Sequence, residues 1–221
     1  MGRACKFARS WLNFAPCCRR NPCAHEPFPA GLTLSYSPSS LRLAAARRAI
    51  AAGGVVACPT EAVWGLSCDP DNAEAVGRVL ALKQRPVEKG LILVAAGESQ
   101  LAFLLADLPS QQRAILRDSW PGPATWLVPH QGRVQPWVHG EHQTVAVRVS
   151  AHPVVQALCN AWGGPLVSTS ANPGGAQPPR AGFQVRRYFG DDLDAILPGA
   201  VGGSRRPTTI RDLASARVVR T

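Results

Sequence analysis

The strongest constraint on the fold is a series of short apolar segments separated by amphipathic helical segments. Apolar runs of this length, bounded by turn residues, are typical of buried strands. We expect strands at residues 55–58, 63–66, 91–95, 125–128, 145–149 and 166–169, and shorter ones near 194–197, 208–211 and 217–219. Helical periods cover residues 40–52, 72–83, 99–118, 152–162 and 181–189. Because strands and helices do not alternate strictly, the sequence predicts an α/β domain around a mixed β-sheet.

Residues 1–31 differ from the rest of the chain. They hold four of the seven cysteines, several prolines and no sustained periodicity. The spacing of Cys17, Cys18, Cys23 and His25 matches no standard zinc motif, and arginines interrupt any apolar run that a signal peptide needs. We expect a disordered N-terminal extension, or a start codon placed too far upstream, followed by one catalytic domain over residues 32–221.

The composition indicates a globular protein without a membrane span. No apolar run reaches the roughly 20 residues that cross a bilayer, so we expect a cytoplasmic protein with no membrane partner. The odd number and wide spacing of the cysteines argue against a disulfide framework, and Cys58 and Cys159 lie in apolar surroundings typical of a core. The net charge of +10 suits a polyanion such as ATP or RNA, and a general preference for arginine explains it equally well.

Three cations form the first candidate site. The chain has no Walker loop and no Gly-x-Gly-x-x-Gly after its first strand, so side chains would have to hold any nucleotide phosphates. Lys83, Arg85 and Lys89 lie within seven residues at a helix-to-strand connection, where they can converge on a triphosphate. Taken alone, the pattern fits a solvated turn better.

Polar residues at two further strand ends form the other candidates. Alternation places Ser168 and Ser170 on one side of a strand, with Asn172 just beyond, and such groups bind phosphate or ribose. Thr60 and Glu61 follow the strand at 55–58, where they suit a small polar substrate, an ammonium group or a metal. Ordinary turns use the same residue types.

Other reaction classes lack support in the sequence. The cysteines and histidines show no metal-ligand spacing, and no Gly-x-Ser-x-Gly elbow marks a serine hydrolase. We expect no protein-built metal site. The scattered histidines, which we expect at the surface or in caps, are His130, His139, His142 and His152.

Read in order, the motifs resemble those of the YrdC-like threonylcarbamoyl-AMP synthases, specifically the short bacterial form called TsaC. The similar stretches are residues 59–66, 82–93, 120–125, 145–149 with 152–153, and 165–172. Five motifs in the right order are far more specific than any one of them. Trp64 stands where a smaller aromatic residue is usual, and Pro207-Thr208-Thr209-Ile210 only approximates the usual segment, which leaves its role in doubt.

The resemblance implies a YrdC-like single domain with a twisted mixed β-sheet, flanking helices and a positively charged concave surface. It also implies a nucleotidyltransferase that converts L-threonine, bicarbonate and ATP into L-threonylcarbamoyladenylate and pyrophosphate. A threonylcarbamoyl-transferase complex would receive the adenylate and modify the tRNA adenosine beside the anticodon. ATP with Mg²⁺ is then a substrate, and we expect no tightly bound cofactor.

The resemblance carries roles onto individual residues. Lys83 and Arg85 would be the catalytic residues and would hold the nucleotide phosphates together with Lys89, while Thr60 would contact threonine. The rest of the substrate and nucleotide surface would be formed by Thr125, Arg148, Ser168, Ser170 and Asn172. A non-catalytic RNA-binding protein that uses the same basic surface is the main alternative, and direct tRNA contact stays open. A carbamoyl-transfer module of hydrogenase maturation proteins is a third, disfavoured by the absent acylphosphatase and zinc-finger regions.

Overall fold

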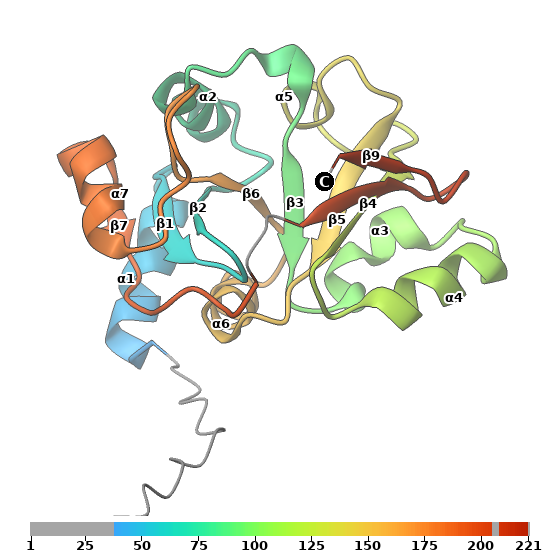
Figure 1. Ribbon diagram of the computed structural model, residues 1–221, viewed down its shortest axis with the longest axis horizontal. Coiled ribbons are helices and arrows are strands. Elements are labelled where there is room, and N and C mark those ends of the chain that lie inside the picture. The colour runs from blue at the N-terminus through green and yellow to red at the C-terminus, as the bar shows by residue number, and fades with distance from the viewer. Residues whose placement is uncertain (1–37, 205–207, 221) are drawn as a thin grey trace, which may run out of the picture. The chain divides into compact units, whose positions relative to one another are not determined.

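The computed structural model describes residues 38–204 and 208–220. Within this part of the chain, nine strands form one sheet with helices packed around it (Figure 1). The strands are β1 (Val56–Pro59), β2 (Trp64–Ser67), β3 (Ile92–Ala95), β4 (Ala124–Pro129), β5 (Thr144–Val149), β6 (Leu166–Ser170), β7 (Ala195–Ile196), β8 (Thr209–Asp212) and β9 (Val218–Arg220). Their order across the sheet is β7-β1-β2-β6-β3-β5-β4-β8-β9.

The sheet is mixed, as the sequence predicts. Strands β3 and β5 pair in parallel, as do β1 with β7 and β4 with β8. The pairs β1–β2, β2–β6, β3–β6, β4–β5 and β8–β9 are antiparallel. The α/β class with a mixed sheet and flanking helices is thereby confirmed.

The helices are α1 (Ser40–Ala51), α2 (Ala73–Lys83), α3 (Ala102–Leu105), α4 (Ser110–Ser119), α5 (Pro136–His139), α6 (Pro153–Trp162) and α7 (Gly182–Phe189), with 3₁₀ turns η1 (Val87–Lys89), η2 (Glu98–Leu101) and η3 (Gly190–Asp192). The Asn72 side chain accepts a hydrogen bond of 3.0 Å from the Ala75 amide and so begins α2. The single helix expected over residues 99–118 is wrong. This segment divides into η2, α3 and α4. Pro109 has no amide hydrogen to donate to the preceding helical turn, so α3 does not continue through it, and α4 begins at the next residue.

Both faces of the sheet are covered, so successive residues of a strand enter two different cores. In β1, Val56 and Cys58 pack with α1 and α6, whereas Ala57 packs into the larger core that includes α2. This explains why β1 is apolar throughout instead of alternating. Cys58 and Cys159 are buried core residues, as predicted, and burial raises the pKa of the Cys58 thiol to about 12.

Residues 1–31 lie outside the described residues, so the division into an extension and a domain at 32–221 stays a prediction. None of the described helices is long and apolar enough to cross a membrane.

Candidate functional site

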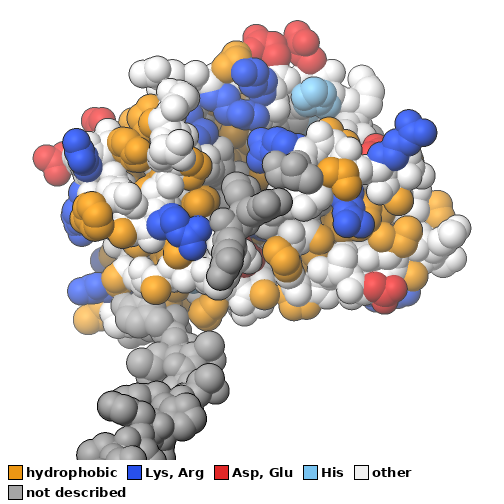
Figure 2. Space-filling model, viewed as in Figure 1, with side chains coloured by type: hydrophobic (Ala, Val, Ile, Leu, Met, Phe, Trp, Pro, Cys, Tyr) orange, Lys and Arg blue, Asp and Glu red, His pale blue; other side chains and the backbone are white. Residues whose placement is uncertain are grey.

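A cavity of about 800 Å³ opens on the sheet. Its walls come from the β1–β2 turn, the α2–β3 connection, β5, the end of β6 and the β8–β9 hairpin. Lysine and arginine side chains gather on this face of the molecule (Figure 2). The cations that line the cavity are Lys83, Arg85, Lys89, Arg148 and Arg220, and no carboxylate is among the described lining residues. Several cations therefore attract an anionic ligand in this cavity, and no described lining residue carries a negative charge that would repel it.

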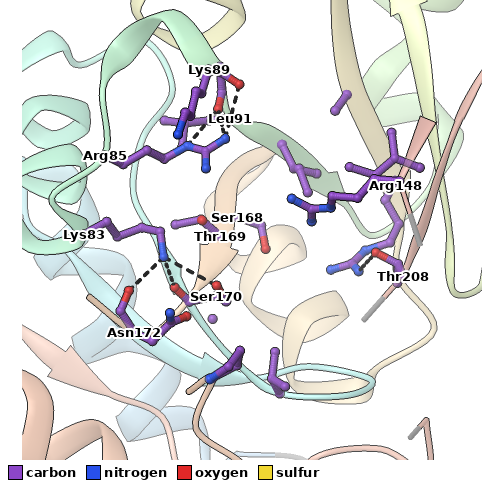
Figure 3. Close-up of a pocket in the computed structure, with 18 of the residues that line it drawn as sticks. Lys83, Arg85, Lys89, Leu91, Arg148, Ser168, Thr169, Ser170, Asn172 and Thr208 are labelled. Atoms are coloured by element: carbon purple, nitrogen blue, oxygen red, sulfur yellow. Dashed lines mark hydrogen bonds between the residues drawn. The ribbon is translucent and has the colours of Figure 1, made fainter. Parts of the chain in front are cut away.

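Lys83 is the most buried cation of the α2–β3 connection. It ends α2, and Gln84 then turns the chain in a left-handed conformation with φ of 49°. Its ammonium donates hydrogen bonds to the carbonyl oxygens of Ser170 at 2.5 Å and Asn172 at 3.0 Å, and lies 3.4 Å from the Ser170 hydroxyl (Figure 3). Desolvation, with the neighbouring charges of Arg85 and Arg220, lowers the pKa of Lys83 to about 8.

Arg85 organises the turn that carries Lys89. Its Nε and Nη2 atoms donate to the Gly90 carbonyl at 3.2 and 2.9 Å, and Nη2 also donates to the Lys89 carbonyl at 3.2 Å. These bonds leave Nη1 for a ligand. Lys89 itself is exposed at the cavity rim. Lys83, Arg85 and Lys89 thus all line the cavity. The first two bond to backbone carbonyls of neighbouring loops, and Lys89 faces solvent.

The end of β6 supplies the polar side chains opposite these cations. Ser168, Ser170 and Asn172 all line the cavity. The Asn172 amide nitrogen donates to the carbonyls of Pro173 and Ala176, while its Oδ1 atom is buried without a hydrogen-bond partner. A buried acceptor without a partner is costly unless a ligand satisfies it. Thr60 also lines the cavity, and its hydroxyl donates to the Val63 carbonyl at 2.8 Å.

The structure separates Thr125 from the other predicted residues. Thr125 is fully buried, does not line the cavity, and places its hydroxyl 3.1 Å from that of Thr208. Direct contact of Thr125 with a ligand therefore has no geometric support here. Thr208 takes that place at the wall, where it accepts a 3.1 Å hydrogen bond from Arg148 Nη1. Thr208 was missed because its segment only approximates the family motif.

One histidine corrects the sequence interpretation. His130 is 7% exposed and is neither a surface nor a cap residue, whereas His152 is the N-cap residue of α6, as expected, and is equally buried. His130 stacks on His139 with ring centroids 3.9 Å apart, and His139 and His142 line the cavity. Isolated histidines carry no spacing signal, so the sequence could not assign them to this wall.

A metal site built by the protein is not found in the described part of the chain. No group of three or more His, Cys, Asp or Glu residues there is arranged to hold a metal ion. The Glu61 carboxylate lies beside the lining residue Arg148, and its Oε1 atom accepts hydrogen bonds from the Ser150 hydroxyl and the Ala151 amide.

Fold and cavity together define an α/β protein with a cation-lined pocket large enough for a nucleotide. The family model Sua5/YciO/YrdC, described as "Telomere recombination", matches residues 48–221. The chain belongs to this family.

Similar proteins extend along most of the chain. The threonylcarbamoyl-AMP synthase of Marinobacter nauticus is 58% identical over 185 residues, which are 83% of this chain and 97% of that relative. The crystal structure of P. abyssi Sua5 complexed with L-threonine matches with a TM-score of 0.73 and 31% identity, over 78% of this chain and 51% of that one. E. coli YciO matches with a TM-score of 0.74 and 25% identity, over 83% and 90%. The chain thus spans about half the length of P. abyssi Sua5.

Proposed function

We propose that this chain is a threonylcarbamoyl-AMP synthase, which converts L-threonine, bicarbonate and ATP into L-threonylcarbamoyladenylate and pyrophosphate. The observation that carries the proposal is the 58% identity to a relative of that name over 97% of the relative's length. The cation-lined cavity, with no carboxylate among its described lining residues, agrees with this reaction. A non-catalytic RNA-binding protein is not favoured, because the relative that matches 83% of this chain carries the name of an enzyme.

The reaction needs alignment and charge neutralisation more than a protein nucleophile. The threonine amine and bicarbonate form a carbamate with loss of water. A carbamate oxygen then attacks the α-phosphorus of ATP, the bond from that phosphorus to the bridging oxygen breaks, and pyrophosphate leaves with the electron pair. Cations around the phosphates stabilise the charge that develops in this step.

The residues divide into two walls in this proposal. Lys83, Arg85 and Lys89 hold the phosphates, and Arg85 offers its Nη1 atom. The three protons of Lys83 face protein acceptors, so Lys83 acts through its charge and must exchange one of these bonds to touch a phosphate. Thr60 contacts threonine. The remaining substrate and nucleotide surface is formed by Arg148, Ser168, Ser170 and Asn172, and Thr125 acts only through Thr208.

Mg²⁺ enters as part of the substrate MgATP. The described lining residues include no carboxylate, so phosphate oxygens and water would be its ligands. We also propose that the adenylate passes to a threonylcarbamoyl-transferase complex that modifies tRNA, and that the protein works in the cytoplasm. Any contact with tRNA itself would use the basic rim of the cavity.

The test is incubation of purified protein with MgATP, bicarbonate and radiolabelled threonine, followed by analysis of pyrophosphate and labelled product. We expect pyrophosphate release that requires both threonine and bicarbonate. A variant that combines Lys83→Ala and Arg85→Ala should stay folded and lose this activity. Folded native protein that releases no pyrophosphate would overturn the proposal, and salt-sensitive RNA binding would then support the alternative.

A further inference from the structure

We propose that Glu61 is a positioning residue, whose buried carboxylate fixes the guanidinium of Arg148 at the cavity wall. This inference rests on the proposed function for the identity of the anionic ligand, the phosphates of ATP. The sequence suits Glu61 to a small polar substrate, an ammonium group or a metal, whereas in the structure its carboxylate faces protein groups.

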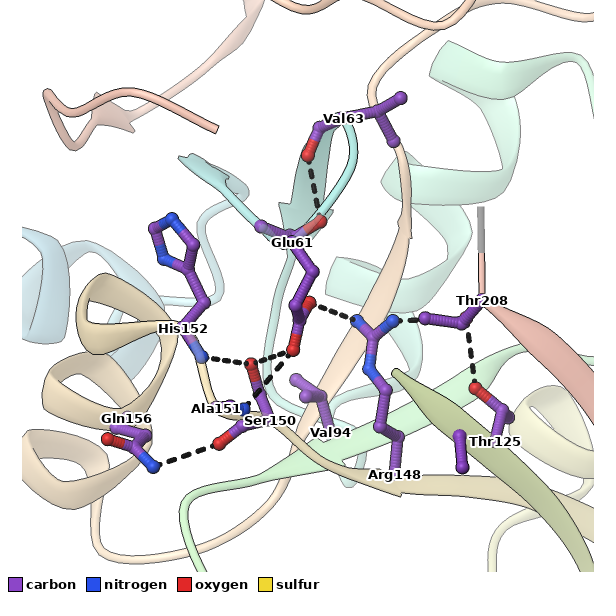
Figure 4. A network of polar contacts seen from close by, with 12 residues as sticks. Glu61, Val63, Val94, Thr125, Arg148, Ser150, Ala151, His152, Gln156 and Thr208 are labelled. Carbon is purple, nitrogen blue, oxygen red and sulfur yellow. Dashed lines mark hydrogen bonds and ion pairs between the residues drawn. The ribbon is translucent and has the colours of Figure 1, made fainter. Parts of the chain in front are cut away.

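The Glu61 carboxylate is anchored from one side. It lies just after β1 and is 8% exposed. Its Oε1 atom accepts a 2.6 Å hydrogen bond from the Ser150 hydroxyl and a 3.2 Å hydrogen bond from the Ala151 amide (Figure 4). Both donors belong to the connection that follows β5. The other oxygen, Oε2, faces Arg148 and accepts no hydrogen bond from the described residues.

The Arg148 guanidinium is held between two groups. Its Nη2 atom lies 3.7 Å from Glu61 Oε2, and its Nη1 atom donates to the Thr208 hydroxyl at 3.1 Å. The Arg148 side chain is slightly more buried than that of Glu61, yet it lines the cavity, and its Nε atom has no hydrogen-bond partner among the described residues. The contacts with Glu61 and Thr208 therefore leave N–H groups of Arg148 that can donate hydrogen bonds to a ligand.

Burial explains why the carboxylate is needed. An arginine with this little exposure is costly unless an opposite charge compensates it. At 3.7 Å and without a hydrogen bond, Glu61 compensates the charge of Arg148 but does not occupy its donors. Arg85 shows the contrasting arrangement, since its Nε and Nη2 atoms are already bonded to carbonyl oxygens. Arg148 thus keeps donors for a phosphate, as Arg85 keeps its Nη1 atom.

A segment near the C-terminus packs against the backbone of Thr60 and Glu61. The Ser204 amide donates to the Glu61 carbonyl at 3.1 Å, and the Gly202 amide donates to the Thr60 carbonyl at 2.9 Å. A Cβ atom on Gly202 would lie only 2.8 Å from the Glu61 carbonyl oxygen, so only glycine allows this approach. Glu61 therefore links the β1–β2 turn, β5 and the segment that leads to Thr208.

The test is a double-mutant cycle with Glu61→Gln, Arg148→Gln and the combined variant. The glutamine keeps an oxygen for Ser150 and Ala151, and it turns a donor instead of a charge toward Arg148. ATP affinity is measured by calorimetry, and kcat and KM are measured for synthesis. We expect Glu61→Gln to weaken ATP binding and raise KM for ATP by about 100-fold, the cost of a misplaced binding group. The combined variant should lose no more than Arg148→Gln alone.

The opposite results are equally clear. Additive losses would show that Glu61 acts independently of Arg148, and tighter ATP binding by Glu61→Gln would show that it only reduces the charge of Arg148. Either result would overturn the proposal. If Glu61→Gln does not fold, Ser150→Ala replaces it in the same cycle, because it removes an anchor of the carboxylate and keeps the charge. A purely structural role would lower the unfolding midpoint and leave the ATP affinity of the folded protein unchanged.

Failure of the proposed function is distinguishable from failure of this inference. Calorimetry of ATP binding requires no turnover. A native chain that binds ATP but makes no adenylate would overturn the synthase proposal, and the double-mutant cycle would still decide the role of Glu61. A native chain that does not bind ATP would overturn both.

Discussion

The Lys83 ammonium donates a 2.5 Å hydrogen bond to the backbone carbonyl of Ser170, which lies 87 residues further along the chain. This contact joins the end of α2 to the end of β6, the two segments that form opposite sides of the proposed phosphate site. A second bond, to the Asn172 carbonyl, holds the next turn. Lys83 therefore both shapes the site and supplies charge to it.

Loss of the Lys83 ammonium should abolish most of the activity. We expect Lys83→Met to lower kcat/KM for ATP by at least about 100-fold, because a charge aimed at the phosphates and the anchor of the β6 loop are lost together. Steady-state pyrophosphate release measures this. The exposed Arg113, changed to alanine, is the control for loss of a cation and should have no effect. A Lys83→Met loss below threefold would contradict the proposed role.

The lowered pKa of Lys83 predicts that ATP binding weakens in mild alkali. With a pKa of about 8 in the free protein against an ordinary 10.5, the ammonium deprotonates as the pH rises through 8. ATP affinity should therefore fall about eightfold between pH 7.5 and 9, in proportion to the charged fraction. Calorimetry without threonine or bicarbonate avoids the titrations of those substrates. In Lys83→Arg, whose side chain stays charged, the fall in ATP affinity between pH 7.5 and 9 should vanish. If the fall persists, another group is responsible for the titration.

The same shift makes a prediction for stability. Between pH 8 and 10.5 the unfolded chain binds a proton at Lys83 that the folded protein has already released. The contribution of Lys83 to the free energy of unfolding should therefore rise with pH across this window. Urea unfolding of the native protein and of Lys83→Met, compared at pH 7.5 and 10, measures the difference. A contribution that falls with pH would show that Lys83 is not desolvated.

The two threonines at Arg148 should have different effects. Thr208→Val removes the acceptor for Arg148 Nη1, so we expect KM for ATP to rise about tenfold, as for a lost hydrogen bond to a charged group. Thr125→Val removes a hydroxyl that lies outside the cavity wall, and should mainly lower the free energy of unfolding, by about 1 kcal/mol. Kinetics and urea unfolding separate them. A larger kinetic defect in Thr125→Val would restore Thr125 as a direct ligand contact.

Gly140 supports the turn that carries Lys89. Its φ is 64°, and a Cβ atom there would lie 2.7 Å from the Val87 carbonyl oxygen. Gly140→Ala should push this turn aside and weaken ATP binding about tenfold. Gly132 is the matched control, since its φ is 74° and a Cβ atom would meet nothing within 4 Å. Gly132→Ala should lose stability by backbone strain alone. Equal ATP affinities of the two variants would contradict the proposal that Gly140 supports the turn that carries Lys89.

The sequence by itself determined the local elements and the phosphate motif. Apolar runs such as that over 91–95 predict strands because a strand buried on both faces cannot be polar on either, and the Asn72 cap is a local hydrogen bond. Lys83, Arg85 and Lys89 lie within seven consecutive residues, so their proximity needed no knowledge of the rest of the chain. The motif order was likewise enough for the family, which the comparisons confirm.

Tertiary structure alone decided what the isolated residues do. Thr125 and Thr208 look alike in sequence, and only the pairing of β4 with β8 buries the first and leaves the second at the wall. Glu61 fits a substrate or metal ligand until Ser150 and Arg148 are brought to it from positions almost 90 residues away. Local propensity depends on neighbours in the chain, whereas burial, charge compensation and cavity walls depend on contacts between distant segments, which a single sequence does not specify.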